Sequence, residues 1–135
     1  MALVTFVNDS APYLNAENLN NNFNEINNKT IPEDISNLIT FENDEQAYGQ
    51  FKKIGNMVMI TYQGSAKTHT ANKTLFTLPS GYRPSGSSSV FVPFVKNNNA
   101  YGIIEINTSG VCKVNQISST TASGRIYFVV TYVVN

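Results

Sequence analysis

The strongest constraint on the fold is a succession of short apolar and β-branched runs that begins at Ala47 and continues to the end of the chain. Turn-forming stretches rich in Gly, Pro, Asn and Ser separate these runs. The seven runs read "AYGQFKKI", "NMVMITYQG", "KTLFTL", "SVFVPFV", "AYGIIEIN", "GVCKVN" and "RIYFVVTYVV". Short strands separated by turns are typical of an antiparallel sandwich or barrel. The sequence therefore predicts a mainly β protein in which residues 47–135 form an antiparallel β-sandwich or jelly-roll-like head.

Two of the expected strands are apolar on both faces. In residues 126–134 one face carries Ile126, Phe128, Val130, Tyr132 and Val134, and the other carries Tyr127, Val129, Thr131 and Val133. The stretch "MVMI" at 57–60 repeats the pattern. An antiparallel strand that faces solvent normally carries polar residues on that side. The second apolar face predicts contact with another copy of the chain in a symmetric oligomer. The alternative is that residues 1–46 fold back as a cover.

A helical segment precedes the β region. Leu19, Phe23 and Ile26 fall at spacings of four and three, which places them on one stripe of a helix. Asn15 is a suitable N-cap, and Leu14 with Leu19 forms a hydrophobic staple, so the helix is expected to start near Ala16. Asparagine is a poor helix former, so something must bury the stripe. The same helix of sister chains in a short coiled coil is one candidate, and packing on the chain's own domain is the other.

A second short apolar face is expected in "IPEDISNLITF", where Pro32 stands near a helix start and Ile35, Leu38 and Ile39 follow. We therefore divide the chain into a segment 1–46 for attachment and helical oligomerisation, and the β head 47–135. Residues 1–50 carry eight acidic side chains against Lys29 alone, whereas residues 51–135 carry eight basic side chains against Glu105 alone. A basic half attracts polyanions, although scattered lysines also serve solubility.

The sequence offers few residues for catalysis. It contains one His and one Cys, and the expected head holds one carboxylate, Glu105. This inventory is too small for a triad, a glycosidase carboxylate pair or a zinc site, so we expect no enzyme, no metal and no cofactor. His69 is interpreted as an exposed loop histidine, and Cys112 as a strand residue of ordinary packing.

Other partner classes are also disfavoured. The lysines are spread over many strands without the aromatic interleaving of a single-strand platform, so no nucleic-acid partner is expected. No apolar run approaches the roughly 20 residues of a membrane span, and "MALVTFVNDSAP" lacks the features of a secretory signal. The sequence thus predicts no membrane insertion and synthesis in a cytoplasm.

Four stretches of the β region carry a family resemblance: "GNMVMITYQG", "TLFTLPSGYRPSGSSSVFVPF", "IIEINTSGVCKV" and "GRIYFVVTYVV". In this order, with the "LP-GYRP" corner, they resemble the head domain at the C-terminus of phage tail and receptor-binding proteins. The front, "VNDSAPYLNAENLNNNFNEI", resembles the opening segment of phage tail and fibre proteins of Gram-positive hosts. Between them, only about residues 30–50 are unmatched.

The resemblance implies a non-enzymatic virion protein, made in the host bacterial cytoplasm, of the tail, baseplate or fibre. It further implies a homotrimer, an N-terminal segment that docks onto another virion protein, and a β head that binds host surface saccharide for adsorption. Without an extended shaft, the chain suits a short baseplate, tail-tip or capsid-attached spike. The alternative is a structural head-fibre, decoration or plug protein with no receptor role.

The expected sites follow from these implications. The "LPSGYRP" loop is predicted to be a structural corner with the Tyr82 ring packed beneath it. Sugars are held by aromatic faces and by planar amide or cationic groups, which two other loops supply. The predicted ligand-binding residues are Lys67, His69, Lys96, Asn98 and Tyr101, and the predicted oligomer and attachment residues are Tyr13, Leu14, Leu19, Phe23 and Ile26.

Overall fold

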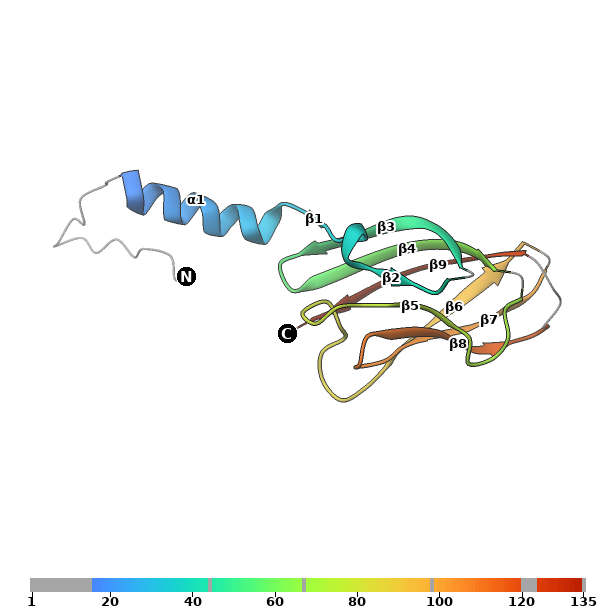
Figure 1. The fold of residues 1–135 in the computed structure, drawn as a ribbon. Helices are drawn as coiled ribbons and strands as arrows, with labels where there is room; N and C mark the ends of the chain where they lie inside the picture. Colours follow the sequence, from blue (N-terminus) through green and yellow to red (C-terminus); the bar gives the residue numbers. More distant parts are fainter. Residues whose placement is uncertain (1–15, 44, 67, 98, 120–123, 135) are drawn as a thin grey trace.

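The structure is a computed structural model that describes residues 16–43, 45–66, 68–97, 99–119 and 124–134. It contains one α-helix, one short 3-10 helix and nine strands (Figure 1). Their bounds are α1 (Ala16–Thr30), β1 (Glu33–Asp34), η1 (Ser36–Leu38), β2 (Thr40–Phe41), β3 (Gln46–Ile54), β4 (Met57–Ala66), β5 (Thr74–Thr77), β6 (Val90–Lys96), β7 (Tyr101–Ile106), β8 (Val111–Ile117) and β9 (Gly124–Val133). The predicted mainly β fold with an N-terminal helix is confirmed, and the seven expected strands correspond to β3 through β9.

All strand pairs are antiparallel, in the order β1-β3-β4-β9-β6-β7-β8-β5-β2. The sheet curls, so that β3, β4 and β9 form one layer and β5, β7 and β8 lie across from it (Figure 1). The strands β4 and β9 pair along their whole length, whereas β9 and β6 pair only at Val95↔Tyr127 and Lys96↔Ile126. This short junction is where the sheet passes from one layer to the other.

Aromatic rings fill the space between the layers. Tyr62 stacks on Phe128 with ring centroids 4.9 Å apart, and Phe51 meets Phe76 edge-on at 5.3 Å. Such pairs each contribute about 0.5–1.5 kcal/mol beyond the area they bury. Cys112 is buried beside them, as its position in an ordinary strand predicted.

Residues 33–41, here called the strap, differ from the second short helical segment that the sequence predicts there. They do not form a second helical face: β1 pairs with β3, β2 pairs with β5, and only the three residues of η1 are helical. The Ile35 amide donates to Phe51 O at 2.9 Å, because hydrogen bonds to the sheet replace those of a helix. Ile35 and Ile39 are buried in the core, whereas Leu38 is exposed. The strap, assigned from sequence to segment 1–46, is therefore integrated with the β head.

The "LPSGYRP" loop is a structural corner, as predicted. The Arg83 Nε donates to Leu78 O at 3.1 Å, and Gly81 has a φ of 88°, which favours glycine. Tyr82 packs against the core, and its hydroxyl donates to Glu33 Oε1 at 2.9 Å, which raises the pKa of Tyr82. The corner thus joins the strap to the sheet.

The outer surface of β4 and β9 carries exposed apolar residues. Along β9, side chains alternate between the core and the outside, and Val129 and Val133 are exposed, Val133 beside Met57 of β4 and Val129 beside Thr61. The described part of segment 1–46 does not cover this surface. The predicted contact with another copy of the chain stays a prediction.

Helix α1 starts at Ala16, as the N-cap predicted, and extends away from the head (Figure 1). Its stripe of Leu19, Phe23 and Ile26 is exposed, with 60% of Phe23 accessible, so packing on the chain's own domain is not observed among the described residues. Tyr13 and Leu14 lie outside the described residues. Within the part that the structure describes, no helix is both long and apolar enough to span a membrane.

Candidate functional site at the loop end of the head

The connections β2–β3, β4–β5, β6–β7 and β8–β9 lie at the end of the head that is remote from α1, here called the loop end (Figure 1). The β4–β5 and β6–β7 connections contain the loops predicted to bind a ligand. Antiparallel strands of similar length necessarily return their alternate connections to one end. The fold therefore brings both predicted loops to the end that points away from the helix.

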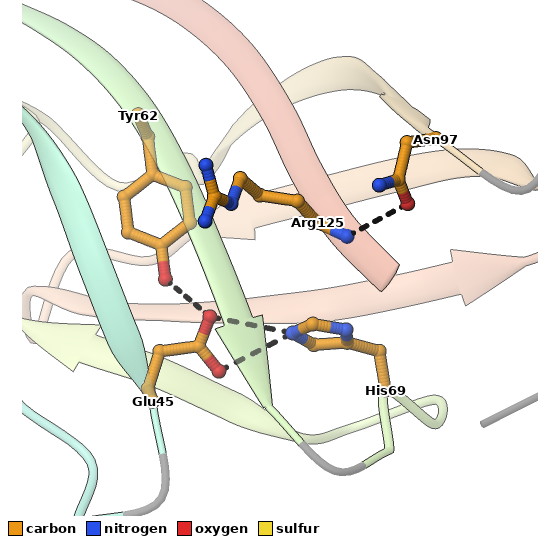
Figure 2. A network of polar contacts seen from close by, with 5 residues as sticks. All are labelled: Glu45, Tyr62, His69, Asn97 and Arg125. Carbon is orange, nitrogen blue, oxygen red and sulfur yellow. Dashed lines mark hydrogen bonds and ion pairs between the residues drawn. The ribbon is translucent and has the colours of Figure 1, made fainter. Parts of the chain in front are cut away.

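A buried polar network lies beneath these loops (Figure 2). Glu45, just before β3, accepts a hydrogen bond of 2.6 Å from the Tyr62 hydroxyl at Oε1. His69 Nε2, from the β4–β5 loop, lies 3.3 Å from Oε1 and 3.2 Å from Oε2 of the same carboxylate. All three residues are buried. One carboxylate therefore connects the start of β3, the middle of β4 and the loop that follows β4.

Burial shapes the electrostatics around Glu45. Desolvation, and after it the hydrogen bond to Glu45, raises the pKa of Tyr62, so its hydroxyl remains a donor. Lys96 points inward, because it alternates along β6 with the exposed Val95, and burial lowers the pKa of Lys96 while the Glu45 charge opposes that shift. At Gly64, a Cβ atom would press on the Tyr62 hydroxyl and on Glu45 Oε1, so the network requires a residue without a side chain there.

The pairing of Glu45 with His69 resembles the acid–histidine half of a catalytic triad. Its geometry instead favours a structural role, in which the pair holds two chain segments together. The His69 Nδ1 is buried and has no hydrogen-bond partner among the described residues, so no hydroxyl or thiol is placed there as a nucleophile. The imidazole itself has no accessible surface. Among the described residues, no group of three potential metal ligands comes together either. The arrangement is suited to holding two chain segments in a fixed relation.

The five predicted ligand-binding residues occupy different environments. His69 is fully buried, so its interpretation as an exposed loop histidine is wrong: the Glu45 carboxylate holds it inside. Lys96 is also buried, whereas Tyr101 is 66% exposed. Lys67 and Asn98 lie outside the described residues. His69 contacts the Glu45 carboxylate, and Lys96 lies within the influence of its charge. A role of these residues in ligand binding stays a prediction.

Glu45 is the residue that the sequence interpretation missed. The sequence places Glu45 in the acidic segment 1–46 and leaves Glu105 as the one carboxylate expected in the head. The contact between Glu45 and His69 spans 24 residues, and no local pattern marks it. The sequence carries only an indirect signal for Glu45: a histidine that is buried needs a polar partner, and an acidic side chain near the head can supply it. Glu105 itself accepts from Ser89 Oγ at 2.8 Å and pairs with Lys113 at 3.3 Å on the half-buried surface.

Exposed groups surround the network on its outer side. Arg125, at the start of β9, extends across β4 (Figure 2), and its guanidinium lies 5.5 Å from the ring centroid of Tyr48 on β3. The Arg125 amide donates to Asn97 Oδ1 at 2.9 Å, which joins the β6–β7 connection to β9. The loop end thus has a buried, hydrogen-bonded interior and an outer surface of aromatic, amide and cationic groups.

No family model matches the chain, and no curated protein matches it. Solved structures do match, among them the following two. The receptor-binding protein (gp15) of Listeria phage PSA aligns with a TM-score of 0.57 and 13% identity over 86% of this chain and 74% of its own. The head domain of lactococcal phage bIL170, a receptor-binding domain, aligns with a TM-score of 0.54 and 14% identity over 78% of this chain and 99% of its own.

The fold is that of a phage receptor-binding head. The sequence resemblance to phage receptor-binding proteins is thereby supported at the level of the fold, while the "LP-GYRP" motif is not tested by these comparisons. At such identities the likeness concerns the backbone. The surface residues of this chain must therefore be judged from its own geometry.

Proposed function

We propose that the chain is a non-enzymatic phage virion protein whose β head binds a saccharide on the host surface during adsorption. The observation that carries this proposal is the shared fold with two phage receptor-binding proteins. The arrangement of the chain supports it, because the loop end lies opposite α1 (Figure 1). One end is thus free to reach the host while the other is attached.

The attachment end is proposed to be the N-terminal segment. The stripe of Leu19, Phe23 and Ile26 leaves an apolar surface on a helix that is poor in helix-forming residues. The aliphatic residues exposed on the outer face of the sheet lie toward the same end, at Met57 and Val133. Association into a homotrimer would bury both surfaces, and residues before α1, including Tyr13 and Leu14, would dock onto another virion protein.

The loop residues divide into two proposed roles. Tyr101 is exposed and can contact a sugar directly, and we retain Lys67 and Asn98 as proposed ligand residues. His69 and Lys96 are buried around Glu45, so we assign them to fixing the loops in this conformation. The binding surface would then be preorganised, which limits the entropy lost on binding.

The proposal is tested with the purified full-length chain. Cell walls from Listeria and lactococcal strains are sedimented with the protein, and competition with phage adsorption to the same cells is measured. Saturable binding that blocks adsorption, without release of reducing ends from the wall, supports the proposal. Retention of the protein in virions without binding to any wall would instead favour a structural head-fibre, decoration or plug protein. Release of reducing ends would indicate an enzyme.

A further inference from the structure

A row of outward-facing residues crosses five strands near the loop end. In the strand register, Tyr48 of β3 pairs with Gln63 of β4, Gln63 with Tyr127 of β9, Tyr127 with Val95 of β6, and Val95 with Tyr101 of β7. We call these five residues the tyrosine row. Because paired residues in a sheet point to the same side, the row forms a continuous line on the outer surface.

The members of the row are accessible. Tyr48 is 59%, Val95 61%, Tyr101 66% and Tyr127 37% exposed, and Gln63 is half-buried. Four inter-strand spacings of about 4.8 Å give the row a length of roughly 19 Å along the curved surface of the sheet. Tyr48, Gln63 and Tyr127 lie side by side on one layer, and the row bends at the β9–β6 junction to continue through Val95 to Tyr101.

A shallow hollow of about 300 Å³ adjoins the row between β4 and β9. It is lined by Thr61, Tyr62, Gln63, Tyr127, Phe128 and Val129. The Thr61 hydroxyl and the Gln63 amide supply polar groups beside the Tyr127 ring. A pyranose ring presents apolar C–H faces and polar hydroxyl edges. The Tyr127 ring can contact such a face, while the Thr61 hydroxyl and the Gln63 amide beside it can bind the hydroxyls.

The charged group beside the row is a cation. Among the described outward-facing positions of β3, β4 and β9, the charged residues are Arg125 beside the row and Lys52 nearer α1. The carboxylates of the neighbouring strands stand opposite lysines, Asp34 of β1 opposite Lys52 and Glu105 of β7 opposite Lys113. The Arg125 guanidinium, held over the Tyr48 ring, has no ion pair with a described residue. A guanidinium fork of this kind is well matched to a phosphate group.

We propose that the tyrosine row, with Arg125, binds a phosphate-bearing glycan chain, its sugar rings lying on the tyrosines and a phosphodiester at Arg125. This assignment rests on the proposed receptor-binding function and specifies its ligand class and location. A second copy of the chain is the other possible occupant of a sheet face. The outer residues toward α1, Ile54, Met57 and Val133, are aliphatic and suit such a contact better than the polar and cationic groups around the row do.

The probe is glycosylated poly(glycerol phosphate), used free in solution and as the lipid-anchored form in vesicles. Equilibrium binding of the full chain is compared with that of Tyr48→Ala, Tyr127→Ala and Arg125→Gln. We expect each tyrosine variant to weaken binding about tenfold, the effect of losing one strong ring contact. Arg125→Gln should weaken binding and flatten its salt dependence. Preference for the lipid-anchored form alone would assign the ligand to a membrane-anchored polymer.

The matched control is Phe91→Ala, which removes an exposed aromatic ring of β6 outside the row. It should bind as the unmodified chain does. Each variant is first checked for an unchanged far-ultraviolet circular dichroism spectrum. If Tyr127→Ala does not fold, binding by Tyr48→Ala, in β3 near the edge of the sheet, and by Arg125→Gln decides whether the row is the site.

The outcomes separate the two proposals. Unchanged affinity in the row variants, or an equal loss in Phe91→Ala, overturns the row as the site. A change of native oligomer mass without a change in affinity also overturns it, because the row would then be a subunit contact. Binding to cell walls without binding to the polymer overturns the ligand class while the receptor function stands. Binding to neither overturns both.

Discussion

Replacing Tyr62 by Phe tests whether the buried carboxylate holds the loop end together. The substitution removes one hydroxyl and leaves the ring that stacks on Phe128 in place. The lost hydrogen bond is 2.6 Å long and ends on a carboxylate without accessible side-chain surface. Hydrogen bonds to charged groups contribute about 1.5–3 kcal/mol. We therefore expect Tyr62→Phe to lower the free energy of unfolding by about 2 kcal/mol.

The free energy of unfolding is measured by urea titration at pH 7, at one fixed protein concentration because any association would shift the midpoint. Tyr101→Phe serves as the matched control, since it removes a hydroxyl from an exposed ring and should change stability by less than about 0.5 kcal/mol. Glu45→Gln and the double variant Tyr62→Phe/Glu45→Gln complete a cycle. The two changes should be non-additive, because both remove the same contact.

Two results would refute this reasoning. The first is a Tyr62→Phe variant as stable as the Tyr101→Phe control. The second is strict additivity in the cycle, which would show that Tyr62 and Glu45 contribute independently and that the short contact does not stabilise the fold.

Three further predictions concern packing, pH and association. Gly64→Ala should lower the free energy of unfolding by about 1–3 kcal/mol, because the added methyl group has no room beside Glu45; urea midpoints equal to those of the unmodified chain would contradict this. Burial raises the pKa values of Tyr62 and Tyr132 above their ordinary 10.0, so their contribution to stability is fully present below pH 10 and is lost at higher pH, because the unfolded chain releases these protons first. Unfolding midpoints from pH 8 to pH 11 should therefore fall above pH 10, and a rise would refute the assignment. Phe23→Ser should lower the native mass of the oligomer in light scattering while the β signal in circular dichroism remains; an unchanged mass would remove the α1 stripe from the association surface.

Much of the fold is encoded locally and could be predicted. The strands from β3 to β9 carry alternating or continuous apolar runs, and Gly55-Asn56 forms the expected two-residue turn between β3 and β4, with Gly55 at a φ of 57°. The start of α1 at Ala16 agrees with the position that the sequence predicts from Asn15 as N-cap. In each case the residues that determine the structure lie within a few positions of it.

The failures are long-range. The two-residue strands β1 and β2 are too short to show a period, and they form because the edges of β3 and β5 offer unpaired backbone groups. The isoleucines of the strap were correctly identified as apolar, but an apolar spacing in so short a segment does not distinguish a helix from a strand pair. The buried His69 contacts Glu45, and a contact across 24 residues leaves no local pattern in the sequence.

The strap also determines how a mechanical load would enter this protein. Helix α1 leads directly into β1, and β1 is held to β3 at Glu33↔Lys53 and Asp34↔Lys52. A pull on the helix therefore reaches the edge of the sheet before it reaches the core. Because the far end of the strap is anchored to β5 through Phe41 and Phe76, the same pull would be shared between both edges. A head fastened in this way resists peeling from either side.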